Sequence, residues 1–166
     1  MLEIKFLIII FIIVISSYIG FLKGNVYVER EKEIKNILNS LDYLRNKIEY
    51  TNLFLKDIFN CISDDVYKGK DNMFKKSLSS NLSLRNSFKE EIKNNSKIND
   101  EDKSILLNFA MDLGTMDKKL QISKIDICTN FLTKNLKNAE ELKIKNTKMF
   151  KVLGVVSGLV ISIILI

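Results

Sequence analysis

Uncharged apolar residues fill both ends of the chain. The first run extends from Phe6 to Leu22, and a helix of about 17 residues is about 26 Å long, close to the ~30 Å hydrocarbon thickness of a bilayer. The second run, from Val152 to Ile166, makes a helix of about 22 Å, and the long side chain of Lys151 can reach back toward a membrane surface. The pattern predicts an N-terminal transmembrane helix at residues 1–24 and a C-terminal hydrophobic membrane segment at residues 151–166.

Each run also has a second interpretation. The first could be the apolar part of a cleaved signal peptide, with Ser17 near the cleavage position. A retained helix is favoured because Glu3 offsets the charge of Lys5 at the start of the run, and because apolar residues continue past the serines to Leu22. The second run is short for a span, so it could insert only partly into the bilayer.

Basic residues flank both runs on the side that faces the middle of the chain. They are Lys23, Arg30 and Lys32 after the first run, and Lys143, Lys145, Lys148 and Lys151 before the second. The outer flank has only Lys5 and the amino terminus. Cytoplasmic flanks of membrane helices carry an excess of lysine and arginine. We therefore expect residues 25–150 to form a soluble cytoplasmic helical domain, with both termini across the membrane.

Small residues recur at every fourth position in both apolar runs. They are Ser16, Gly20 and Gly24 in the first run, and Gly154, Gly158 and Ser162 in the second. This spacing places small side chains on one helix face, where two backbones can approach closely. The two runs could pack on each other or on helices of a partner.

The middle of the chain has the periodicity of amphipathic helices. The first extends from about Tyr27 to Tyr50, and its apolar stripe is Ile34, Ile37, Leu38, Leu41, Leu44 and Ile48. Thr51 is a candidate N-cap for a second helix that ends at Ile62. Residues 63–70 are predicted to form a loop. The class expected from this pattern is all-α, a bundle of about six helices between the two membrane segments.

Four further helices are predicted before the C-terminal membrane segment. Two short ones span residues 72–79 and 84–93, and a third begins at an Asn99 or Asp100 cap and reaches Leu113. Gly114 fits the position just past that helix, and Asp117 fits the N-cap of the next. The next helix is long, and nothing interrupts it before the membrane segment. Its predicted core stripe consists of Ile122, Ile125, Thr129, Leu132, Leu136 and Ala139.

Composition argues against catalysis, cofactors and metals. The chain has no histidine, which removes the commonest general base and metal ligand. Two distant cysteines, Cys61 and Cys128, cannot form a zinc site, and no glycine-rich nucleotide loop is present. The net charge of +6 comes almost entirely from lysine, whereas nucleic-acid recognition relies strongly on arginine. We expect no enzyme activity and no nucleic-acid partner.

Several short motifs, taken in order, resemble one known family. They are Gly20-Phe21, Tyr27-Val28-Glu29-Arg30, Ile48-Glu49-Tyr50, Phe109, Leu113-Gly114, Asp117, Gln121 and Lys151-Val152-Leu153-Gly154. Their order between two terminal apolar runs resembles the stage III sporulation protein AB family of endospore-forming Firmicutes. Glu31 and Asn52 stand where that family commonly has proline.

The resemblance implies a place in a multi-protein assembly, a channel between mother cell and forespore. It also implies a domain similar to the cytoplasmic domains of type II secretion inner-membrane platform proteins. The implied partners are a cytoplasmic secretion-type ATPase and other channel membrane proteins, with homo-oligomers possible. A pore-forming membrane protein and a membrane-tethered relay or sensor remain alternative functions. Candidate partner-binding residues are Tyr27, Glu29, Arg30, Glu49, Tyr50, Gly114, Asp117 and Gln121. The alternative for the first three is an interfacial anchor with an ion pair, and for Glu49 and Tyr50 it is buried hydrogen bonding. Gly114 and Asp117 could instead form a corner between helices, and Gln121 could bridge helices.

Overall fold

The computed structural model describes residues 2–69 and 72–165, and all regular elements in this part of the chain are helices. Met1, Lys70 and Ile166, which belong to the predicted N-terminal span, loop and C-terminal segment, lie outside the described residues. Contacts divide the chain into two compact units. We call residues 1–31 with 138–166 the terminal unit, and residues 32–137 the central unit.

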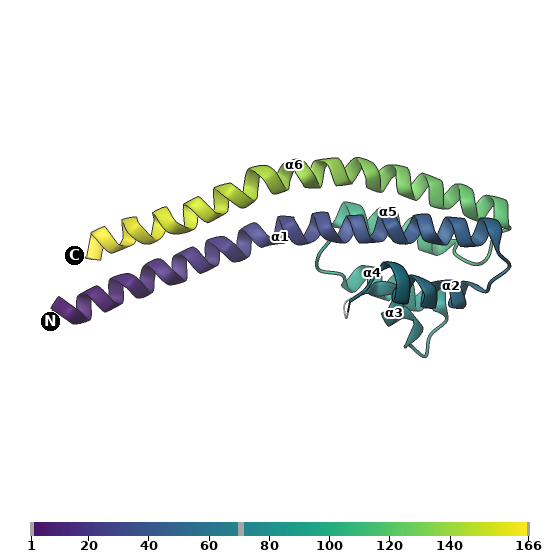
Figure 1. Cartoon of the computed structure of the whole chain (residues 1–166), viewed down its shortest axis with the longest axis horizontal. Coiled ribbons are helices and arrows are strands. Elements are labelled where there is room, and N and C mark those ends of the chain that lie inside the picture. The colour runs from purple at the N-terminus through teal and green to yellow at the C-terminus, as the bar shows by residue number, and fades with distance from the viewer. Residues whose placement is uncertain (1, 70–71, 166) are drawn as a thin grey trace. The chain divides into compact units, whose positions relative to one another are not determined.

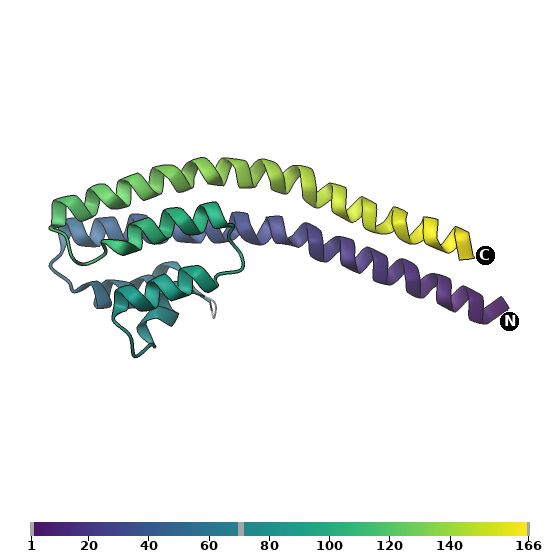
Figure 2. The ribbon, with the colours of Figure 1, turned by 180° about the vertical axis from the view of Figure 1, so that it is seen from behind.

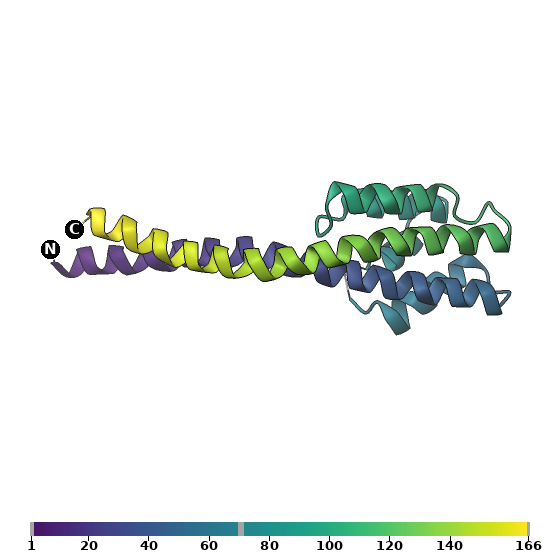
Figure 3. The same ribbon diagram turned by 90° about the horizontal axis from the view of Figure 1, so that it is seen from above.

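Two long helices contribute to both units. Helix α1 extends without interruption from Leu2 to Tyr50, and α6 extends from Lys118 to Leu165. The predicted first span and the predicted amphipathic helix are thus parts of one helix. The last helix continues through the C-terminal apolar run, as its sequence predicts. In the terminal unit the purple end of α1 and the yellow end of α6 run antiparallel, side by side (Figures 1 and 3).

The central unit adds five shorter elements between the two long helices. They are α2 (Leu55–Cys61), a π-helical turn (Ile62–Val66), α3 (Met73–Leu78), α4 (Leu84–Asn94) and α5 (Asp100–Met111). Helices α2, α3 and α4 pack around three phenylalanines, with ring centres 5.0–5.2 Å apart: Phe59, Phe74 and Phe88. Seen from behind, these short helices lie along one side of the α1 segment that belongs to this unit (Figure 2).

The predicted stripe of α1 forms the centre of this core. Ile34, Ile37, Leu41 and Leu44 are fully buried, whereas Leu38 and Ile48 are half-buried at the edge of the stripe. This spacing is that of a helix whose apolar face packs against neighbouring helices. The all-α class and the long amphipathic helix are therefore confirmed.

The hydrogen bonds at the helix caps show which predicted helix starts are correct and which one is wrong. Asn99 caps α5 in a capping box with Asp102, and the Asp117 carboxylate accepts a hydrogen bond from the Leu120 amide of α6 at 2.8 Å. The predicted Thr51 cap is wrong. The Thr51 hydroxyl instead donates to the Lys47 carbonyl at the end of α1, and α2 begins only at Leu55.

Two other boundaries also differ from the sequence prediction. The predicted loop at residues 63–70 begins as the π-helical turn, because the chain stays helical past Cys61 and the Tyr67 amide bonds to the Ile62 carbonyl. Helix α5 ends at Met111, so Gly114 lies beyond the predicted position just after the helix. Its φ of +75° still requires a residue without a Cβ penalty.

Candidate helix-packing and partner sites

The two helices of the terminal unit meet at glycines. A Cβ added to Gly20 would lie 2.5 Å from the Phe150 carbonyl oxygen and 2.8 Å from the Gly154 Cα. A Cβ on Gly154 would lie 2.9 Å from the Ser16 carbonyl oxygen, and one on Gly158 would lie 3.0 Å from the Ile13 Cα. Real Cβ atoms essentially never approach other atoms as closely as those added at Gly20 and Gly154 would, so a larger residue at either position would force the helices to shift, whereas at Gly158 the contact would be tight. We call this line of contact the glycine seam.

Hydroxyl groups bond across or along the glycine seam. The Ser16 hydroxyl donates to the Gly154 carbonyl at 2.7 Å, and the Thr147 hydroxyl donates to the Gly24 carbonyl at 3.2 Å. Ser162 is buried and donates to the Gly158 carbonyl of its own helix. The structure thus brings five of the six predicted small residues into direct contact between the two helices, and it places Ser162 on the same buried face of α6.

Outside the seam the terminal unit exposes its apolar side chains. Leu7, Phe11, Val14, Ile163 and Ile164 are among the exposed large apolar residues. Both apolar stretches are long enough to cross a membrane, and little of either is buried inside the protein. This distinguishes them from the core helices of a water-soluble protein, which bury such residues.

Of the three candidate residues in the terminal unit, Tyr27 lies nearest the seam. Its ring stacks on Phe150 with centres 6.0 Å apart, so it contacts α6. Glu29 and Arg30 are half-buried, and Arg30 already has an interaction within the protein. One residue further on, the buried Glu31 accepts a hydrogen bond from the Lys143 ammonium at 3.1 Å.

The other candidates gather where α1 turns into α2 and α5 turns into α6. A groove of about 300 Å³ is lined there by residues that include Ile48, Leu55, Gly114 and Gln121. We call it the turn groove. Glu49, Tyr50 and Asp117 directly adjoin lining residues in the chain. Tyr50 and Phe54 are 78% and 81% exposed beside the groove, and Leu53 adds a third exposed apolar side chain.

An ion cluster fixes α1 to α6 near the turn groove. The Arg45 guanidinium donates to Asp126 at 2.7 Å and to Glu49 at 2.6 Å. The hydrogen bond to Asp126, followed by the charges of Asp126 and Glu49, raises the pKa of Arg45 above its ordinary value. Glu49 therefore has a role within the protein, as part of this cluster.

Sequence reasoning missed the buried polar residues of the central unit. Glu33 is 2% exposed, and its carboxylate accepts hydrogen bonds from the Tyr67 hydroxyl at 2.5 Å and the Asn95 amide group at 2.7 Å. Asp102 is fully buried and accepts a hydrogen bond from the Asn135 amide group at 2.8 Å. Glu33 directly precedes the apolar stripe, which is the one signal in the sequence that places it near the core.

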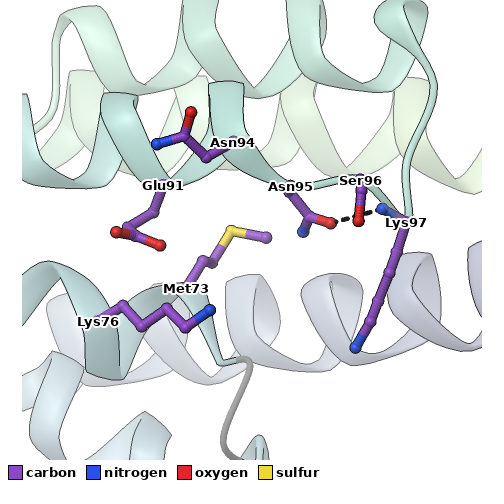
Figure 4. A pocket seen from close by; sticks show the side chains of 7 residues that line it. All are labelled: Met73, Lys76, Glu91, Asn94, Asn95, Ser96 and Lys97. Atoms are coloured by element: carbon purple, nitrogen blue, oxygen red, sulfur yellow. Dashed lines mark hydrogen bonds between the residues drawn. The ribbon is translucent and has the colours of Figure 1, made fainter.

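A small polar pocket lies beside Asn95. It has a volume of about 140 Å³ and is lined by Met73, Lys76, Glu91, Asn94, Asn95, Ser96 and Lys97 (Figure 4). The Asn95 side chain lies at its rim, where its oxygen accepts a hydrogen bond from the Lys97 amide at 2.9 Å. Asn95 thus shapes the loop between α4 and α5 and joins it to Glu33 on α1.

Reactive groups do not converge in the described part of the chain. Residues 2–69 and 72–165 contain no group of three histidine, cysteine or acidic side chains that could hold a metal ion. Cys61 and Cys128 are both free thiols. Burial raises the pKa of the Cys128 thiol to about 12, so it stays protonated and packs as an apolar group.

A pair of apolar helices joined through glycines, with a compact helical unit built on their other halves, defines a membrane-associated all-α protein. The chain belongs to the stage III sporulation protein AB family, whose model matches residues 5–166. It is 25% identical over 171 residues to the stage III sporulation protein AB of Bacillus subtilis (strain 168), covering 94% of this chain and 95% of that protein. No solved structure matches.

Proposed function

We propose that the chain is a non-enzymatic platform component of a secretion-like channel between mother cell and forespore. In this role it couples a cytoplasmic ATPase to membrane partners. The observation that carries the proposal is the continuity of α1 and α6, each of which contributes one half to the apolar pair and one half to the central unit. A hydrogen-bonded helix without a break transmits displacement along its axis, so both helices suit a mechanical link.

The proposed location is the mother-cell side of the engulfed forespore, with the central unit in the cytoplasm and both termini across the membrane. The lysines that flank the apolar stretches support this orientation. Retention of the first apolar stretch is supported by its contacts, because Gly20 and Gly24 pack against α6. A cleaved leader would leave that face of α6 without its partner.

The turn groove is the proposed contact surface for the ATPase. Tyr50, Leu53 and Phe54 project there as an exposed apolar cluster, and exposed aromatic residues are typical anchors of protein interfaces. Gly114 and Gln121 line the groove from the other turn. Binding at this surface would act on the end of α1 and the start of α6 together.

The test is capture of the family-associated secretion-type ATPase by the full-length chain in detergent. Phe54→Asp should reduce capture by at least about tenfold, since loss of an interface anchor costs 2 kcal/mol or more. Leu82→Asp is the matched control, because Leu82 is also exposed but belongs to the loop between α3 and α4. Equal capture by both variants contradicts the contact surface, and ATP hydrolysis by the purified chain alone contradicts the non-enzymatic role.

The link between the two units can be tested separately in sporulating cells. Arg30→Glu and Gly158→Leu should each lower the yield of heat-resistant spores at matched protein levels. The first reverses a charge at the end of the terminal unit, and the second places a side chain against the Ile13 Cα. Wild-type spore yield from both variants contradicts the coupling role.

A further inference from the structure

The glycine seam sets which residues of the two helices lie at the same depth. Gly24 lies against Thr147, Gly20 against Phe150 and Gly154, and Ile13 against Gly158. Each step toward the N-terminus of α1 is therefore matched by a step toward the C-terminus of α6. The apolar stretches of the two helices cover the same depth as far as the described residues extend.

This register brings lysines from both helices to one level. Lys23 adjoins Gly24, Lys148 adjoins Thr147, and Lys151 adjoins Phe150, so all three lie where the apolar stretches end. Lys145 lies one turn of α6 further from the apolar stretch. All four are exposed, and we call them the lysine collar.

Acidic residues are missing from the sequence around the lysine collar, apart from Glu141 four residues before Lys145. The sequence contains no aspartate or glutamate between Ile4 and Val28 or after Glu141. Within the described residues, none of the four collar lysines pairs with a carboxylate. Lys143, by contrast, is paired with Glu31, and both residues lie further from the apolar stretches than the collar does. Three unpaired positive charges thus lie where the apolar stretches end, with a fourth one helical turn further along α6.

Aromatic residues surround the collar in the manner of a membrane interface. The Lys151 ammonium lies 5.0 Å from the centre of the Phe21 ring, and Tyr27 stacks on Phe150. Tyr18 is exposed within the adjoining apolar stretch. Aromatic side chains are enriched at the headgroup level of bilayers, and long lysine side chains extend to the same level. The collar therefore lies where lipid phosphates would be.

We propose that the lysine collar binds the headgroups of anionic phospholipids. The inference rests on the proposed membrane insertion of the terminal unit. It assigns the collar a ligand class in addition to its effect on orientation: phosphate-bearing lipids with a net negative charge. Bound lipids would neutralise the repulsion among the lysines and hold the terminal unit at a fixed depth in the bilayer.

The experiment uses the full-length chain with Leu22→Trp, reconstituted into vesicles. The sequence has no other tryptophan, and Leu22 is exposed next to Lys23. The fluorescence of the introduced tryptophan therefore reports on lipids bound beside the collar. Brominated phosphatidylglycerol and brominated phosphatidylcholine are compared as quenchers in otherwise unlabelled phosphatidylcholine vesicles. The test variant carries Lys23→Gln, Lys148→Gln and Lys151→Gln. The matched control carries Lys56→Gln, Lys134→Gln and Lys137→Gln, which removes the same charge from exposed positions of the central unit.

Phosphatidylglycerol should be preferred over phosphatidylcholine by the wild-type collar and by the control. Each lysine near an anionic leaflet contributes a factor of roughly five, so the test variant should lose at least about tenfold of the preference. Equal quenching by both lipids in the wild type overturns the proposal. Loss of the preference on adding inorganic phosphate, but not on adding sodium chloride of equal ionic strength, also overturns it, because the site would then bind free phosphate rather than lipid.

The same data separate this inference from the membrane proposal. If neither brominated lipid quenches the tryptophan, the terminal unit is not inserted, and both ideas fail together. If phosphatidylcholine quenches as strongly as phosphatidylglycerol, the insertion stands and only the lipid preference fails. Capture of the ATPase through the turn groove is measured in detergent and is independent of either result.

Discussion

The same two helices pack by different chemistry in the two units. In the terminal unit, α1 and α6 meet through glycines, and their backbones touch at Gly20 and Gly154. In the central unit, α1 buries large side chains such as Ile34 and Leu41, and it reaches α6 through the Arg45–Asp126 ion pair.

The difference follows from the solvent that each region is suited to. In water, burying large apolar side chains is the main driving force. In lipid the surroundings are already apolar, so close backbone contact and hydroxyl bonds hold helices together instead. Accordingly, the terminal unit exposes most of its large apolar side chains and buries its glycines, whereas the central unit buries a core of large apolar side chains and leaves Gly69 and Gly114 exposed.

A charge in the core of the central unit should cause the largest loss. Leu41→Asp places a carboxylate at a fully buried position without a partner, and it should lower the free energy of unfolding by more than about 3 kcal/mol. Asn39→Asp, which adds the same charge at an exposed position of α1, should change it by less than about 0.5 kcal/mol. Urea unfolding of the full chain in detergent, followed by circular dichroism, measures both. Equal midpoints would mean that the stripe is not a core.

A side chain in the glycine seam should separate the helices of the terminal unit. The Ser16 and Ser157 hydroxyl oxygens are 2.7 Å apart, so Ser16→Cys with Ser157→Cys should form a disulfide readily when Cys61 and Cys128 are replaced. Gly20→Leu should prevent this crosslink, because its Cβ alone would overlap the Phe150 carbonyl, and overpacking costs about 1–3 kcal/mol. Val155→Leu, at an exposed position of α6, is the control and should crosslink fully.

The features that depend on local sequence can be predicted, whereas those that depend on distant partners cannot. The stripe of α1, the Asn99 and Asp117 caps and the four-residue spacing of small residues can all be predicted, because they depend on local periodicity or on a single turn. The predicted stripe of α6 is buried at only half of its positions. Ile125, Leu132 and Ala139 are buried, but Cys128 and Asn135 take the positions between them in place of Thr129 and Leu136.

The features that the sequence does not predict share a physical cause, which is their dependence on partners outside the local pattern. Asn135 is buried because its amide finds Asp102 on α5, and Glu33 is buried because it finds Tyr67 and Asn95. These partners are far away in the sequence, so no local pattern indicates them. Thr51 has the residue type of an N-cap, yet its hydroxyl bonds backward to α1. The groove shared by two separate turns could not be foreseen either, since it requires the tertiary arrangement.

Loss of a hydrogen-bond acceptor at Glu33 should lower the stability of the central unit by an intermediate amount. Glu33→Gln removes the charge that strengthens the hydrogen bonds from the Tyr67 hydroxyl and the Asn95 amide group. It also leaves one acceptor oxygen where the carboxylate has two, so one of the two hydrogen bonds is lost or must reverse its direction. The expected loss of stability is about 1–2 kcal/mol. Asp42→Asn removes the same charge at an exposed position of the same helix and should be close to neutral. If both variants unfold at the wild-type urea concentration, Glu33 contributes no net stability to the central unit.

The smallest effect is expected from a hydroxyl in the glycine seam. Thr147→Val removes the hydrogen bond to the Gly24 carbonyl but keeps the shape of the side chain. Hydrogen bonds between membrane helices contribute only about 0.6 kcal/mol on average, since the separated helices find other partners. The disulfide between Ser16→Cys and Ser157→Cys should therefore still form. In mixed micelles of rising dodecyl sulfate content, its yield should fall to half at a slightly lower dodecyl sulfate fraction than in the chain that keeps Thr147. Gly24→Leu at the facing position should lower that fraction much further, because its Cβ would lie 3.2 Å from the Thr147 carbonyl oxygen. If the two variants are equally harmful, hydrogen bonding holds the seam as strongly as close packing does. The contrast between the units would then lie in the size of their side chains and not in the force that joins their helices.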